Sequence, residues 1–242
     1  MFKIKIHFLY YVTAFICVLN GFFKDFIILN AIILFHELGH ILMALKLKWN
    51  IDKVIILPLG ALTIFNEKIN KPIIQEFLIC ISGPLFQILI FIINFLFINN
   101  QKIYNYNLFI LLLNLIPILP LDGSKIINLI LNKFFSFKFS HILSIYISII
   151  MIIVLIFLNM FNFNLVIFIT LIFNFIKTLK EFLNHNLVYK KFLFERYLYN
   201  FNFSKRKIIK NIYEIKRDYK HLFYINKNYK TEKEILSQMF DF

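Results

Sequence analysis

The sequence predicts an all-α polytopic membrane protein, and its composition, six long apolar runs and distribution of positive charge all support that class. Of the 242 residues, 60% are hydrophobic and only 17% are charged, whereas soluble domains are about half apolar and a quarter charged. This composition excludes a disordered chain and a disulfide-rich secreted scaffold. Cys17 and Cys80 lie inside apolar runs and are expected to pack as small hydrophobic residues.

Six apolar runs are long enough to cross the hydrocarbon core of a bilayer as helices, which takes about 20 residues. We expect these spans at 6–23, 26–46, 73–98, 104–121, 139–160 and 162–180. The first run follows two lysines, as in a signal peptide. However, no small-residue cleavage site follows it, so we expect an uncleaved helix.

The lysines flanking the predicted spans predict the orientation of the chain in a cell membrane. Segments on the same side as the N-terminus carry ten of them: Lys3, Lys5, Lys46, Lys48, Lys53, Lys68, Lys71, Lys125, Lys133 and Lys138. Only Lys24 and Lys102 lie on the other side. By the positive-inside rule, both termini are expected in the cytoplasm. The net charge of +14 then indicates contact with membrane lipid.

Hydropathy falls after about residue 180, which predicts a membrane domain over 1–180 and a short basic cytoplasmic tail over 181–242. Aromatic residues alternate with basic residues in the tail, a texture that is also found in RNA-binding segments. We interpret the tail as a juxtamembrane basic segment that lies near anionic lipid head groups. We therefore expect no nucleic acid as a partner.

The predicted second span contains His36, Glu37 and His40 near its middle. Two histidines four residues apart lie on one face of a helix, so both imidazoles can reach one metal ion. Glu37 lies beside that position, where a general base for a water molecule is needed. Ionisable groups at this depth are costly unless they pair or bind something. The alternative is a histidine pair that only forms hydrogen bonds between helices.

Asp122 is the candidate third metal ligand, because a hydrolytic zinc site uses three protein ligands and one open position. Pro117 and Pro120 interrupt the apolar run before it, and Gly123 permits a bend after it. The alternative role for Asp122 is a loop residue that caps the next helix. Asn114 lies in the same run and is a candidate to hold the substrate, or else forms an interhelical hydrogen bond.

The segment 49–65 between the second and third spans is too short and too β-branched for another crossing. We expect a membrane-associated β-hairpin with a turn at Pro58 to Gly60. Its edge can pair with an extended substrate near Gly60, and the alternative is a simple interfacial loop. Ser82-Gly83-Pro84 in the third span predicts close helix packing or a kink near the site.

These motifs together resemble the site-2 protease family of intramembrane zinc metalloproteases, peptidase M50. HELGH at 36–40, SGP at 82–84 and NLIPILPLDG at 114–123 occur in the family's order on successive spans. The resemblance is closer to the sporulation branch, of the stage IV FB type, which releases a sigma factor from a membrane-tethered precursor. Three segments carry that closer resemblance: WNIDKVIILPLG at 49–60, PILPLDGSK at 117–125 and KFLFERYLY at 191–199.

The resemblance implies a Zn²⁺ cofactor bound by His36, His40 and Asp122, with Glu37 as the catalytic base. It implies a three-helix catalytic core within 26–125 and regulated hydrolysis of a membrane-tethered protein substrate, namely a pro-sigma factor during sporulation. The branch also has inhibitory membrane partner proteins and a nucleotide-sensing CBS domain. The tail is too short for a full CBS unit and would be a truncated, CBS-like segment.

Metal-assisted peptide hydrolysis near the cytoplasmic membrane face is the function that we expect from these residues. Four alternatives stay open at this point. They are a zinc protease with a broader quality-control or signal-peptide-clearing role, a water-accessible membrane zincin with a glutamate ligand, a non-catalytic pseudoprotease scaffold, and a zinc transporter.

Overall fold

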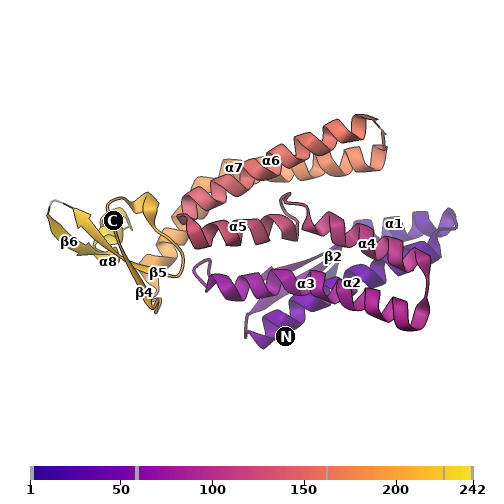
Figure 1. The fold of residues 1–242 in the computed structure, drawn as a ribbon, viewed down its shortest axis with the longest axis horizontal. Helices are drawn as coiled ribbons and strands as arrows, with labels where there is room; N and C mark the ends of the chain where they lie inside the picture. The colour runs from indigo at the N-terminus through magenta and orange to yellow at the C-terminus, as the bar shows by residue number, and fades with distance from the viewer. Residues whose placement is uncertain (1–2, 58–59, 162, 226, 241–242) are drawn as a thin grey trace. The chain divides into compact units, whose positions relative to one another are not determined.

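The computed structural model describes residues 3–57, 60–161, 163–225 and 227–240 and is mostly helical (Figure 1). Within these ranges the chain forms eight α-helices and two three-stranded sheets. It divides into two compact units. The first consists of residues 1–67 and 77–115, and the second consists of residues 68–76 and 116–242.

The first unit combines a helical part with a small mixed sheet. Its helices are α1 (Phe8–Leu19), α2 (Phe23–Lys46), α3 (Ile73–Ile93), which begins in residues of the second unit and continues as the π-helical turn η1 (Asn94–Ile98), and α4 (Gln101–Leu115). Its strands are β1 (Lys3–Ile6), β2 (Ile51–Leu57) and β3 (Gly60–Phe65).

The predicted hairpin is confirmed, since β2 and β3 pair antiparallel from Ile51↔Phe65 to Leu57↔Gly60. Pro58, at the predicted turn, lies outside the described residues. The sequence did not predict β1, which pairs parallel with β2 and makes the sheet order β1-β2-β3. That pairing joins residues about fifty positions apart, and a local pattern of four residues does not indicate it. The prediction of an all-α fold is wrong in this respect.

Three helices of the described chain are long and apolar enough to cross a membrane: Phe23–Lys46, Ile73–Ile98 and Phe137–Phe161. The expected spans at 6–23 and 104–121 correspond to shorter helices, α1 and α4. Helix α4 ends at Leu115 because Pro117 and Pro120 follow and cannot continue its hydrogen-bond ladder. The structure thus shows three of the six predicted spans as full-length candidates.

The second unit carries helices α5 (Asp122–Phe134), α6 (Phe137–Phe161), α7 (Leu165–Leu198) and α8 (Glu232–Phe240). Figure 1 shows α6 and α7 running side by side. Helix α7 continues without a break through residue 180, where hydropathy falls. The loss of hydropathy therefore marks a change of environment along one helix and not the end of that helix. The division into 1–180 and 181–242 stays a prediction.

The tail folds into a small sheet against helices α7 and α8. Strands β4 (Lys205–Ile209), β5 (Tyr219–Ile225) and β6 (Asn228–Thr231) form it in the order β4-β5-β6. Its hydrophobic core contains Phe137, Tyr189, Phe192, Leu193, Ile209, Ile215, Phe223 and Leu236. Burial of this apolar cluster provides the main stabilisation of the tail.

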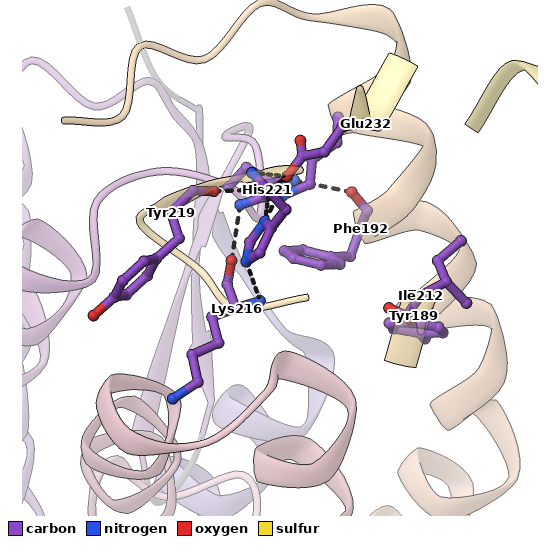
Figure 2. A network of polar contacts seen from close by, with 9 residues as sticks. Tyr189, Phe192, Ile212, Lys216, Tyr219, His221 and Glu232 are labelled. Carbon is purple, nitrogen blue, oxygen red and sulfur yellow. Dashed lines mark hydrogen bonds and ion pairs between the residues drawn. The ribbon is translucent and has the colours of Figure 1, made fainter. Parts of the chain in front are cut away.

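A buried polar network lies beside that core (Figure 2). Arg196 is 3% exposed and forms an ion pair with Glu232 at 2.7 Å. Its guanidinium also donates to Asn70 Oδ1 at 2.8 Å and to the backbone oxygens of Lys216 and Tyr219. In Figure 2, His221 bridges Glu232 and the backbone N–H of Lys216.

The same unit holds the segment that begins α3. The carboxylate of Asp218 accepts hydrogen bonds from the backbone N–H of Ile73, at 3.1 Å for the nearer oxygen. Arg217 forms an ion pair with Glu76 at 2.8 Å and donates to the backbone oxygen of Lys71. A carboxylate at a helix N-terminus satisfies an otherwise unpaired donor and is favoured by the helix dipole.

Candidate zinc site

His36 and His40 lie one turn apart on α2 and turn their Nε2 atoms toward each other. The two Nε2 atoms are 3.0 Å apart, and the side chains are 3% and 7% exposed. The apolar sequence around them forms a helix of 24 residues, so both imidazoles are carried on a rigid element. The expectation that one helical face presents both imidazoles is confirmed.

Each imidazole is held by its other nitrogen. His40 Nδ1 lies 2.7 Å from the backbone oxygen of Ile79, and His36 Nδ1 lies 2.9 Å from Gln87 Oε1. A carbonyl oxygen only accepts hydrogen bonds, so each Nδ1 carries a proton, and Nε2 is the nitrogen of a neutral imidazole that can bind a metal ion. This is the arrangement in which histidines bind zinc, because the ligating nitrogen must be unprotonated and its orientation fixed.

Two Nε2 atoms at 3.0 Å are close enough to share a proton or to bind the same cation. Zn²⁺ fits this donor set, since imidazole nitrogens and carboxylate oxygens are among its usual ligands. The donor atoms that these residues offer are therefore those of a zinc site.

Helix α3 supplies both of these hydrogen-bond acceptors, and a second contact holds one of them. Gln87, which is fully buried, donates to Asn107 Oδ1 on α4 at 3.4 Å, and Asn107 Nδ2 donates to the Gln87 backbone oxygen at 2.9 Å. Ile79 is itself buried in a cluster with Ala44 and Trp49. Packing and hydrogen bonding thus fix both acceptors before any ligand binds.

Two glycines let α2 and α3 approach at the site. A Cβ atom on Gly83 would lie 2.4 Å from His40 Nε2 and 2.7 Å from His36 Cε1. A Cβ atom on Gly39 would lie 2.5 Å from the backbone oxygen of Ser82. Real Cβ atoms are not found at such distances, so only glycine fits at either position. The predicted close packing at Ser82-Gly83-Pro84 is confirmed.

Glu37 follows His36 on α2 and points toward the hairpin. Its Oε2 accepts a hydrogen bond from Thr63 Oγ1 on β3 at 2.9 Å. The strand that could hold a substrate is therefore hydrogen-bonded to the residue that is expected to act as the base. Of the predicted site residues, the structure brings together His36, Glu37 and His40 within the first unit.

Asp122 is the first residue of α5, in the second unit, and is 7% exposed. Its carboxylate lies 3.4 Å from Lys125 Nζ, one turn along the same helix. Like His36 and His40, Asp122 is buried and is of a residue type that could hold a metal ion. The donor set of two histidines and one aspartate suits zinc.

For the two residues predicted to bind substrate, the structure gives the position, and the binding role stays a prediction. Asn114 is half-buried in the last turn of α4, and Gly60 is the first residue of β3.

The sequence analysis missed Gln87, Asn107 and Thr63. Gln87 had a usable signal, because it is a polar residue inside an apolar run, one turn after Gly83. Asn107 and Thr63 had none, since neither residue type is unusual in its segment.

Comparison with known proteins agrees with this site. The model of peptidase family M50 matches residues 25–102, which include most of α2, the hairpin and α3. Over 205 residues the chain is 32% identical to stage IV sporulation protein FB of Bacillus subtilis (strain 168), which covers 81% of this chain and 71% of that protein. Over 119 residues it is 37% identical to a zinc metalloprotease of Methanocaldococcus jannaschii, covering 45% of this chain and 34% of that relative.

A solved structure of a site-2 protease is also similar to this chain. The fold is similar to that of a site-2 protease from Methanocaldococcus jannaschii, with a TM-score of 0.56 and 26% identity, over 74% of this chain and 89% of that one. The sequence relative from Bacillus subtilis is matched over more than two thirds of its length. The buried histidine pair, its neighbouring glutamate and these relatives together show that the chain belongs to peptidase family M50, the site-2 type of intramembrane zinc metalloproteases.

Proposed function

We propose that this protein hydrolyses a peptide bond of a membrane-tethered protein substrate near the cytoplasmic face of the cell membrane. The observation that carries the proposal is the pair of Nε2 atoms 3.0 Å apart, each with its Nδ1 bound to a fixed acceptor, beside Glu37. Asp122 is the proposed third ligand, on its residue type, its burial and its position after a proline-broken segment.

The chemistry divides between the bound metal and the side chains. Zinc at this site would lower the pKa of a bound water and polarise the scissile carbonyl. Glu37 accepts a proton from the attacking water and then delivers it to the leaving amine. Asn114 is proposed to donate a hydrogen bond to the substrate.

The substrate has to be extended, because a helix keeps its carbonyl groups in internal hydrogen bonds. We propose that it pairs with the hairpin edge near Gly60. Support comes from Thr63, which lies on the outer strand β3 and contacts Glu37. An extended segment along β3 would therefore pass near the base.

The proposed substrate is a precursor with an apolar N-terminal segment, such as a pro-sigma factor in a sporulating cell. The relative in Bacillus subtilis is a sporulation protein, which supports this choice. In the same proposal α1, α4 and the first half of α7 also cross the membrane, giving six spans and cytoplasmic termini. Inhibitory membrane proteins and membrane lipid are the further partners, and the tail is a CBS-like remnant.

The test is co-expression of the protein with single-span candidate substrates, with product formation followed on blots. Glu37→Gln keeps the size of the side chain but removes the base, so cleavage should fall by about 100-fold or more while zinc is retained. Asp122→Ala should lose both zinc and cleavage, whereas Asp52→Ala, at an exposed aspartate, should lose neither. Cleavage that persists in Glu37→Gln contradicts the proposed role of Glu37.

A further inference from the structure

Thr63 and Glu37 are joined across two elements that are far apart in the sequence. Thr63 Oγ1 donates to Glu37 Oε2 at 2.9 Å over a separation of 26 residues, in a partly buried position. Strand β3 packs against α2, so the contact lies within the first unit. An ionised carboxylate only accepts hydrogen bonds, and therefore the hydroxyl must be the donor.

This contact fixes the carboxylate of the base. A glutamate side chain has three rotatable bonds, and its terminal torsion is broad, so an unrestrained carboxylate samples many orientations. The hydroxyl holds one oxygen in place, and a hydrogen bond to a charged group is stronger than one between neutral groups. Proton transfer depends on such positioning, because a base must lie within hydrogen-bond reach of the proton.

Strand β3 is an outer strand of the sheet β1-β2-β3. Strand alternation gives Thr63 a different face from its exposed neighbour Leu62. Thus β3 can present its outer edge to an extended peptide while the Thr63 side chain keeps its contact with α2.

We propose that Thr63 is a positioning residue for Glu37 and that it couples substrate pairing on β3 to the orientation of the base. The inference rests on the proposed function, because it assumes that Glu37 acts as the base and that substrate adds to this strand. It assigns to the hairpin a second role in addition to holding the substrate. Ordering of β3 by a paired peptide would then also order the carboxylate.

The test compares Thr63→Val, which keeps the β-branched shape and removes the hydroxyl, with Thr63→Ser, which keeps the hydroxyl. With purified full-length protein and one cleaved substrate, Thr63→Val should lower kcat about 10- to 100-fold, the loss expected for one hydrogen bond to a charged group. The KM and the zinc content should stay at the wild-type values. Thr63→Ser should restore kcat to near the wild-type value. Thr13→Val removes a hydroxyl that bonds to the Tyr10 backbone oxygen in α1, and it should leave kcat unchanged.

A structural role alone would lower zinc content or raise KM, so either change in Thr63→Val overturns the inference. It is also overturned if Thr63→Val cleaves like the wild type, or if Thr63→Ser is as impaired as Thr63→Val.

A thermal-unfolding cycle tests the contact without any substrate. The Tm changes of Thr63→Val and Glu37→Leu should be non-additive in the double variant, because each substitution removes one partner of the same hydrogen bond. Additive Tm changes overturn the contact. If the wild type cleaves no better than Glu37→Gln, the proposed function fails, and this cycle still decides whether Thr63 holds Glu37.

Discussion

The two compact units each contain a buried polar network, and the two networks differ in how their charges are balanced. In the second unit, the Arg196 guanidinium meets the Glu232 carboxylate at 2.7 Å and also donates to Asn70 and to backbone oxygens. In the first unit, His36 and His40 are held through Nδ1 while their Nε2 atoms converge at 3.0 Å.

This difference in charge balance distinguishes a network that stabilises the fold from a network that can bind a ligand. Around Arg196, donors match acceptors and one positive charge meets one negative charge, so the network stabilises the fold by itself. The histidine pair directs two nitrogen atoms toward one point, where a proton or a metal ion can bind. Burial alone therefore does not identify a functional site. A functional site is identified by buried groups that can bind a ligand of a particular charge, which for the histidine pair is a cation.

The largest expected effect is on the histidine network, from Gly83→Ala. The new Cβ would lie 2.4 Å from His40 Nε2, so a ligating nitrogen must move. Zinc affinity should fall by more than about 100-fold, beyond the loss that is usual for outer-shell changes. The measurement is competition with a chelator of known affinity. Leu85→Ala, at an exposed site on the same helix, is the control, and normal zinc binding by Gly83→Ala would contradict the geometry.

The next effect is on the arginine network, from Arg196→Ala. Removing one partner of a buried ion pair leaves Glu232 without its cation, and the second unit should lose about 3–5 kcal/mol of stability. Hydrogen exchange of the β5 amides measures this loss. Arg206→Ala removes an exposed arginine of β4 and should have little effect. If both variants exchange alike, the network does not stabilise this unit.

A smaller effect is expected from Gln87→Leu, which removes the acceptor of His36 Nδ1. Zinc affinity should fall about 10- to 100-fold, because an outer-shell partner orients its ligand. Gln87→Glu keeps an acceptor oxygen and should retain more affinity than Gln87→Leu. Equal affinity in the two variants would show that the contact with Gln87 does not orient His36.

The smallest effect is a pH dependence of the second unit. Burial lowers the pKa of His221 below its ordinary value, while the Glu232 carboxylate acts in the opposite direction and Arg196 and Lys207 act in the same direction. The folded state then binds its proton less readily than the unfolded state. The stability from this group is present above the unfolded pKa of about 6.5 and is lost as the pH falls below it. The protection factors of the β5 amides, which are corrected for the intrinsic pH dependence of exchange, should fall between about pH 7 and pH 5, and His221→Gln should reduce that fall.

Much of the catalytic centre could be predicted from the sequence because it depends on spacing within one helix. Two histidines four residues apart share a face of any α-helix, so His36 and His40 needed no tertiary information. The hairpin was predicted for a similar reason, since its strands are adjacent in the chain. The continuation of α7 past residue 180 was missed because hydropathy reports the surroundings of a helix and does not report its end.

Other features depend on contacts between distant segments, and only the structure reveals them. Strand β1 pairs with β2 across about fifty residues, and Gln87 reaches His36 across 51. The segment KFLFERYLY at 191–199 resembled the sporulation branch, but no physical explanation for that resemblance was evident from the sequence. The structure supplies one, because Phe192 and Leu193 lie in the core of the second unit and Arg196 lies in its polar network.

By itself, the sequence determined the membrane character of the chain, the family, and the residue types of the candidate zinc site. These follow from composition and from short spacings, which local helix geometry converts directly into position. Tertiary structure decided which nitrogen of each histidine is held by α3, why Gly83 must lack a side chain, and that Thr63 holds Glu37. Those properties depend on distances between separate elements, and such distances are set by packing of the whole unit.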